Sequence, residues 1–163
     1  MVCCLRNGDE SHSQRLGTSM TIRDLFRHRE GPGALHVLLA EDNPDHQRIV
    51  THILGGRGHA VDIAEDGQRA ICMAQETCYD VILMDVKMPS LDGLEATKAI
   101  RAKENGNRRV PVIALTACVM KGDRERCVAA GMDGYLSKPI NGLEMIMLVE
   151  TLAAGADTVH DDP

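Results

Sequence analysis

The chain has 163 residues, of which 44% are apolar, and 24 acidic against 18 basic residues give it a formal net charge of −6. This length predicts one domain with tails, large enough to fold without disulfides or a structural metal. The acidic balance argues against nucleic-acid binding, and no apolar run reaches the ~18–20 residues of a membrane span. Six cysteines without a CxxC pair are typical of reduced thiols, so we expect a cytoplasmic protein. From its charge and hydropathy we expect that it neither binds nucleic acid nor inserts into a membrane.

The two ends of the chain differ from its middle. Residues 1–34 are polar, and the breaker sequence GPG lies at their end. Within them, TIRDLF (21–26) predicts one short helix, because Thr21 can cap it and its apolar residues share a face. We interpret 1–34 as a linker or tail with this one weak helix, and residues 155–163 as a disordered tail.

The first half of the central domain alternates buried strands with helices. LHVLLA (35–40) is a continuous apolar run, typical of a buried parallel strand. Asn43 predicts the cap of the next helix and Pro44 its first position, and glycines stop it. HAVDIA (59–64) is less apolar and suits a sheet edge, and the pattern at 67–76 is helical.

The same alternation continues through the second half. Further strands are predicted at YDVILM (79–84), VPVIAL (110–115) and DGYLS (133–137). Helices are predicted at 93–104, at 119–130 and, after a capping pair formed by Asn141 and Glu144, at 141–153.

Five strands alternating with five helices predict a doubly wound α/β fold, (βα)5 and flavodoxin-like, with a parallel sheet and helices on both faces. Right-handed crossovers leave few topologies, and the strand order 2-1-3-4-5 is expected. In that order the first and third strands are neighbours at the switch point. Ligands bind there, outside the carboxyl ends of the strands.

Polar side chains follow the strands at that edge. Glu41 and Asp42 come after the first strand, and Asp85 is the first residue past the third. Two unit charges ~4 Å apart repel by roughly 4 kcal/mol, so a cation is expected, and an all-oxygen cluster suits Mg²⁺. Thr116 and Lys138 follow the fourth and fifth strands. Carboxylates, a divalent cation, a hydroxyl and a lysine suit phosphoryl transfer, in which an aspartate can be the nucleophile.

These motifs resemble the receiver domain of two-component response regulators. The resemblance spans residues 35–154 and is carried, in order, by Glu41-Asp42, VILMDVKMPSLDG (81–93), ALTA (114–117) and YLSKP (135–139). The segments AEDNPDHQ (40–47) and GMDGYLSKPI (131–140) are most similar to receivers attached to hybrid sensor histidine kinases.

The resemblance implies a phosphoacceptor and a metal site. Asp85 would accept a phosphoryl group from a phosphohistidine on a sensor histidine kinase or a histidine phosphotransfer protein. Asp42 and Asp85 would bind Mg²⁺ together with the backbone carbonyl of Lys87, and Glu41 would assist, partly through water. Such a domain is no enzyme beyond catalysing its own Mg²⁺-dependent phosphorylation and dephosphorylation.

The resemblance also implies a switch. Lys138 would pair with the acceptor and then with the phosphate, with a cis bond to Pro139. Thr116 would bond a phosphoryl oxygen and move inward, and Tyr135 would then turn from exposed to buried. The face built from the fourth helix, the fifth strand and the fifth helix would change its partner preference, and a homodimer through this face is one expectation.

Other interpretations share parts of this pattern. A haloacid-dehalogenase-like phosphatase would carry a second Asp where this chain has Lys87, and a flavodoxin-like electron carrier would not place Glu41-Asp42 against a phosphate. A pseudo-receiver serving only as a docking module would lack Asp85 or Lys138. Tyr135 has a structural alternative as a half-buried core residue. The seven histidines share no ligand spacing, and none is predicted to be a phosphorelay histidine. Whether the domain acts alone or within a hybrid kinase stays open.

Overall fold

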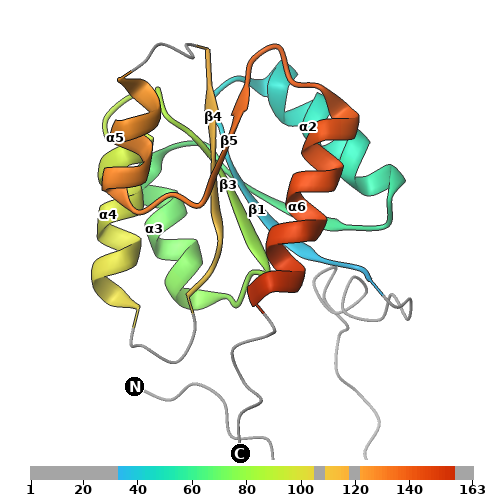
Figure 1. Ribbon diagram of the computed structural model, residues 1–163, viewed down its shortest axis with the longest axis horizontal. Coiled ribbons are helices and arrows are strands. Elements are labelled where there is room, and N and C mark those ends of the chain that lie inside the picture. Colours follow the sequence, from blue (N-terminus) through green and yellow to red (C-terminus); the bar gives the residue numbers. More distant parts are fainter. Residues whose placement is uncertain (1–32, 105–108, 118–121, 157–163) are drawn as a thin grey trace, which may run out of the picture.

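The computed structural model describes residues 33–104, 109–117 and 122–156 (Figure 1). The predicted helix at 21–26 lies outside these ranges. No helix within them is both long and apolar enough to cross a membrane.

Five parallel strands form one sheet in the order β2-β1-β3-β4-β5, which confirms the predicted topology. The strands are β1 (His36–Ala40), β2 (Ala60–Ala64), β3 (Val81–Asp85), β4 (Val112–Thr116) and β5 (Gly134–Ser137). The helices are α2 (Pro44–Gly56), α3 (Gly67–Glu76), α4 (Gly93–Lys103), α5 (Asp123–Ala130) and α6 (Gly142–Ala156).

Side-chain caps fix where most of the helices begin. The Asn43 side chain accepts hydrogen bonds from the first backbone N–H groups of α2, and Pro44 follows it, as predicted. Asp66 and Asp92 cap α3 and α4 in the same way. Asn141 accepts from the N–H groups of the first turn of α6. Each cap satisfies N–H groups that have no partner inside the helix.

Two layers of helices cover the sheet. In Figure 1, α3, α4 and α5 lie on one side of the strands, and α2 and α6 lie on the other. Side chains alternate along each strand, so one set of aliphatic residues packs under each layer. The core is almost wholly aliphatic, because the chain has only two tyrosines, one phenylalanine and no tryptophan.

Several element boundaries differ from prediction, and three of the differences bear on the site or on the predicted tail. Asp85 is the last residue of β3 and is only 6% exposed, rather than lying past the strand. In the same way, Thr116 is the last residue of β4. Helix α6 runs on to Ala156, past the expected end at 153, so the first two residues of the predicted tail are helical. The alanines before Gly155 favour this extension, because alanine is the strongest helix former.

Candidate functional site

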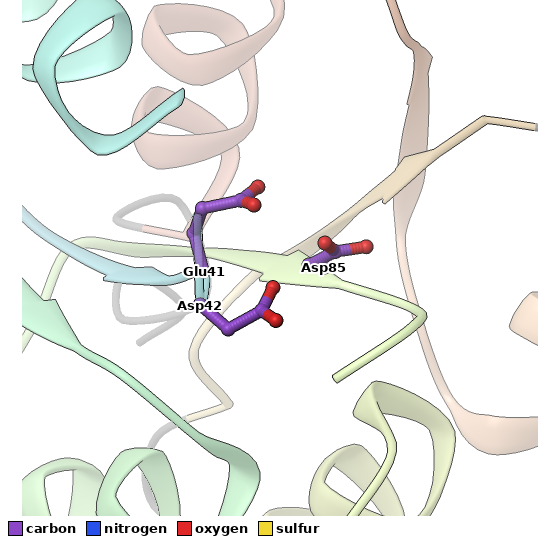
Figure 2. Close-up of side chains that lie close together, drawn as sticks. All are labelled: Glu41, Asp42 and Asp85. Carbon is purple, nitrogen blue, oxygen red and sulfur yellow. The ribbon is translucent and has the colours of Figure 1, made fainter. Parts of the chain in front are cut away.

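Three carboxylates lie together at the carboxyl ends of β1 and β3 (Figure 2). Ala40 is in register with Met84, so the residues that follow them, Glu41 and Asp85, are neighbours. One ligand atom from each of Glu41, Asp42 and Asp85 lies within 4.8 Å of the others. Glu41 is fully buried and Asp42 is exposed. The structure therefore brings together the carboxylates that the sequence placed at this edge.

A lysine ammonium joins two of these carboxylates. Lys138 Nζ donates to Glu41 Oε2 at 2.7 Å and to Asp85 Oδ2 at 2.7 Å. Its backbone N–H donates to the carbonyl of Thr116, which fixes the end of β5 against β4, and the Lys138–Pro139 bond is cis as predicted. Burial lowers the pKa of Lys138, but hydrogen bonds and charge from Asp85 and Glu41 outweigh it, so the pKa is raised. The buried carboxylate of Asp85 at the end of β3 thus has a cationic partner in Lys138.

The raised pKa of Lys138 predicts a loss of stability in alkali. A cation whose pKa is higher in the folded state stabilises the fold at all pH values below its unfolded pKa. For Lys138 that stabilisation is complete below the ordinary value of 10.5 and is lost as the pH rises through the folded pKa. We expect the unfolding free energy of the natural protein to fall more steeply above this pH than that of Lys138→Met. Urea titrations at neutral and strongly alkaline pH measure the difference, and parallel curves for both proteins would contradict this pairing.

Of the remaining predicted residues, Lys87 and Thr116 lie next to Asp85, and Tyr135 lies two strands away on β5. Asp85 Oδ1 accepts a hydrogen bond of 3.0 Å from the backbone N–H of Lys87. Leu115 is in register with Asp85, so Thr116, which is 8% exposed, lies one residue further along the neighbouring strand. Tyr135 is in register with Ala114 and is 36% exposed. The backbone of Lys87 is therefore held at the acceptor, and metal ligation by its carbonyl stays a prediction.

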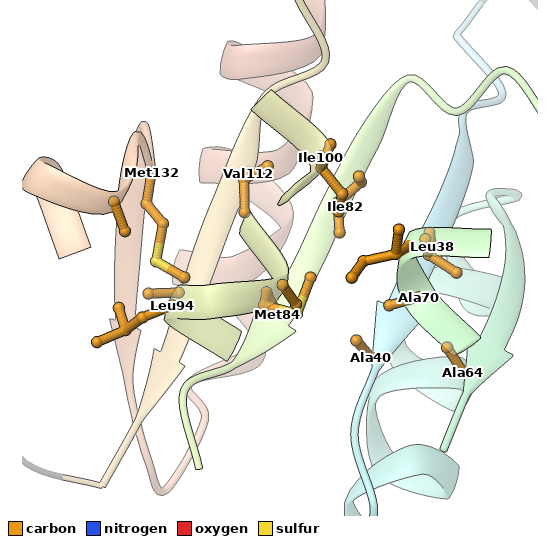
Figure 3. Packing of buried hydrophobic residues seen from close by; sticks show 14 of the residues in the cluster. Leu38, Ala40, Ala64, Ala70, Ile82, Met84, Leu94, Ile100, Val112 and Met132 are labelled. Atoms are coloured by element: carbon orange, nitrogen blue, oxygen red, sulfur yellow. The ribbon is translucent and has the colours of Figure 1, made fainter. Parts of the chain in front are cut away.

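The loop after β3 is packed tightly against the acceptor strand. The N–H of Gly93 donates to the carbonyl of Val86 at 3.0 Å. A Cβ at Gly93 would lie 2.1 Å from the Asp85 carbonyl oxygen, so this position has no room for a side chain. Just past it, Leu94 packs into the aliphatic cluster that contains Met84 (Figure 3). Close backbone contact and buried side chains thus fix the chain on both sides of the acceptor.

His46 is a residue of this site that the sequence did not reveal. Its Nδ1 lies 3.0 Å from Glu41 Oε1, which also accepts from the N–H of Asn43 at 3.3 Å. Both carboxylate oxygens of Glu41 therefore have partners within the chain. The sequence signal for this contact is the position of His46 in the first turn of α2. Because α2 begins beside the end of β1, its first-turn residues lie over that strand end.

The donor set suits a small divalent cation. Three carboxylates and one ammonium leave an excess of negative charge in a small volume, and all the candidate ligand atoms are oxygens. Mg²⁺ prefers oxygen ligands and keeps several waters, which an exposed residue such as Asp42 permits. The residues present therefore fit Mg²⁺.

Comparison with known proteins agrees with this arrangement. The family model described as "Response regulator receiver domain" matches residues 37–150. Hybrid signal transduction histidine kinase I of Dictyostelium discoideum is 44% identical over 121 residues, which cover 71% of this chain and 7% of that protein. Sensor protein GacS of Pseudomonas syringae pv. syringae is 38% identical over 118 residues, which cover 71% of this chain and 13% of that protein. The chain thus spans only a small part of these relatives.

Solved structures share the fold. The receiver domain of a sensor histidine kinase from Pseudomonas aeruginosa, with magnesium coordinated in its active site cleft, is 44% identical with a TM-score of 0.69, and the match covers 74% of this chain and 98% of that one. The Saccharomyces cerevisiae co-crystal of a histidine phosphotransfer protein with the receiver domain of its downstream response regulator matches with a TM-score of 0.71 and 28% identity, over 79% of this chain and 96% of that one. With its own strand order and site geometry, this chain belongs to the response regulator receiver domain family of two-component signalling.

Proposed function

We propose that this domain takes a phosphoryl group from a phosphohistidine onto Asp85 and, in response, changes which proteins it binds. The observation that carries the proposal is the environment of Asp85: a nearly buried carboxylate at a strand end, bonded to a lysine ammonium and next to two further carboxylates. Receiver domains are signalling modules rather than classical enzymes, so we assign the chain no reaction beyond its own phosphorylation and dephosphorylation.

The proposed transfer needs one nucleophile and charge stabilisation. A carboxylate oxygen of Asp85 forms a bond to phosphorus while the phosphorus–nitrogen bond of the donor breaks. The electron pair of that bond stays on the donor imidazole, which takes up a proton. Lys138 Nζ, now 2.7 Å from Asp85, is placed to follow the negative charge onto the phosphoryl oxygens. Thr116, at the end of the adjacent strand, would donate its hydroxyl to one of those oxygens.

The carboxylate cluster supports a role for Mg²⁺ in this transfer. Asp42 and Asp85 would hold the ion together with the backbone carbonyl of Lys87. Glu41 would act through water, in keeping with the donors that already occupy both of its oxygens. When bound, the ion would neutralise charge on the transferred phosphoryl group.

A matched pair of variants tests the metal site. A ligand that binds only the folded state stabilises it by RT ln(1 + [L]/Kd), about 1.4 kcal/mol at ten times Kd. We expect millimolar Mg²⁺ to raise the melting temperature of the natural protein and of Asp45→Asn, an exposed carboxylate on α2 outside the cluster. Asp42→Asn should lose this increment without losing stability in the metal-free state, because it removes charge repulsion. An equal Mg²⁺ shift in Asp42→Asn would refute the assignment.

We propose a sensor histidine kinase or a histidine phosphotransfer protein as the phosphoryl donor. The similarity to receivers of hybrid histidine kinases and to the yeast receiver domain crystallised with a phosphotransfer protein supports this choice.

The face that changes its binding partners, the output face, would be formed by α5, β5 and α6. A homodimer formed through this face is one proposed use of it. Large apolar side chains exposed on these elements favour a homodimer: Val128, Tyr135, Leu143 and Met147.

Phosphotransfer profiling tests the proposed donor class. Each sensor kinase and phosphotransfer protein of the source organism would be labelled with radioactive phosphate and mixed with this domain. We expect one donor to lose its label to this chain within seconds, and to leave Asp85→Asn unlabelled. Failure of every donor, while acetyl phosphate still phosphorylates Asp85, would reject the donor class and leave the acceptor assignment intact.

A further inference from the structure

An arginine of α5 lies over the ring of the tyrosine of β5. Cζ of Arg124 lies 5.2 Å from the centroid of the Tyr135 ring, within the range of a cation–π contact. Arg124 lies in the first turn of α5 and is exposed, and the ring of Tyr135 is partly open to solvent. The contact therefore joins two elements of the proposed output face.

Arg124 makes no competing ion pair within the ranges 33–104, 109–117 and 122–156. Arg126, two residues further along the same helix, differs in this respect because it pairs with Asp123 at 3.6 Å. The guanidinium of Arg124 is planar and weakly hydrated, so an aromatic face is a good partner for it. Within these ranges, the cation–π contact of Arg124 is thus made with the Tyr135 ring alone.

The contact depends on the rotamer of Tyr135. A change in the first side-chain torsion swings the whole ring about its Cα–Cβ bond, which carries the face of the ring away from a guanidinium fixed on another element. An interaction made in only one of two conformations biases the equilibrium between them by its full free energy. Ala114, in register with Tyr135, has the smallest side chain of β4.

We propose that Arg124 is a positioning residue that holds Tyr135 in its outward rotamer in the unphosphorylated domain. This inference rests on the proposed function and on the inward turn of Tyr135 after phosphorylation that the family resemblance implies. An exposed cation–π contact is worth about a two- to fivefold change in population. Arg124 would therefore set a threshold that phosphorylation has to overcome before the output face changes.

Fluorine NMR can measure this threshold because the chain has only two tyrosines. Tyr79 is 3% exposed and donates a hydrogen bond to Asp62, so in protein labelled with 3-fluorotyrosine it serves as an internal reference. We expect R124A to move the Tyr135 resonance, without phosphate, toward its position in natural protein treated with acetyl phosphate and Mg²⁺. R126A removes the same charge from the same helix and should leave the resonance in place. R124K keeps the charge without the planar guanidinium and should fall between the two.

Phosphorylation kinetics supply an independent readout. If an outward ring opposes the switch, R124A should raise the rate of phosphorylation by acetyl phosphate about two- to fivefold. The same substitution in a Y135A background should have no effect, because its partner is gone. An equal effect of R124A in both backgrounds would overturn the inference.

The outcomes separate this inference from the proposed function. An R124A resonance identical to that of the natural protein, with a normal response to acetyl phosphate, would refute the role of Arg124 alone. A Tyr135 resonance that does not move in natural protein carrying phosphate on Asp85 would refute the switch, and the inference with it.

Discussion

Asp85→Asn is expected to abolish phosphate incorporation from acetyl phosphate and Mg²⁺. The amide lacks the nucleophilic carboxylate oxygen, so no slower version of the same reaction remains. The amide oxygen can still accept the hydrogen bond from Lys138, and the substitution removes charge from a repulsive cluster, so the fold should persist. Incorporation is measured with labelled acetyl phosphate on protein whose circular dichroism shows it to be folded.

Asp92→Asn is the matched control for this experiment. Asp92 is the exposed N-cap of α4, close in sequence to the acceptor, and asparagine caps helices as well as aspartate does. It should incorporate phosphate at the natural rate. Phosphate on Asp85→Asn that is stable to acid and labile to base, as an acyl phosphate is, would reject Asp85 as the acceptor.

Gly93→Ala is expected to destabilise the fold by roughly 2–4 kcal/mol, more than a typical surface substitution. The added Cβ would lie 2.1 Å from the Asp85 carbonyl oxygen and 2.9 Å from Met84 Cγ. Relief requires either the end of β3 or the start of α4 to move, because the nearest atom belongs to the backbone. The shift acts on the acceptor residue itself, so the phosphorylation rate should fall as well.

Gly55→Ala shows what the same added methyl does where there is room. Gly55 lies in α2, and a Cβ there would have no heavy atom within 4 Å. Replacing a helical glycine by alanine is expected to raise stability by about 0.5–1 kcal/mol. Urea denaturation of both variants gives the comparison. A Gly93→Ala protein as stable as the natural one would show that the loop after β3 is not packed as described.

The fold was predictable because each strand has a strong local signal. Continuous apolar runs such as LHVLLA and VILM indicate strands buried on both faces, and side-chain caps such as Asn43 mark helix starts. Boundaries were less predictable: Asp85 belongs to β3, where its carboxylate accepts a hydrogen bond from Lys138. Burial of that charge depends on Lys138, which follows β5 and is far from Asp85 in the sequence.

The site was predictable in composition and less so in contacts. Parallel strands bring their carboxyl ends to one edge, so the order of motifs was enough to place Glu41, Asp42 and Asp85 together. The contact of His46 with Glu41 and the cation–π contact of Arg124 with Tyr135 depend on rotamers and on how the helices pack on the sheet. Neither contact follows from a first-turn position alone, since a histidine or an arginine in a first turn is usually solvated.

The most direct test of the central claim is to locate the phosphate chemically. Natural protein would be treated with acetyl phosphate and Mg²⁺, reduced with borohydride, which converts an aspartyl phosphate into homoserine, and sequenced by tandem mass spectrometry. We predict homoserine at position 85 alone, and none when Mg²⁺ is removed by a chelator. Homoserine at another aspartate, or an unmodified position 85 in protein that has gained phosphate, would contradict the account.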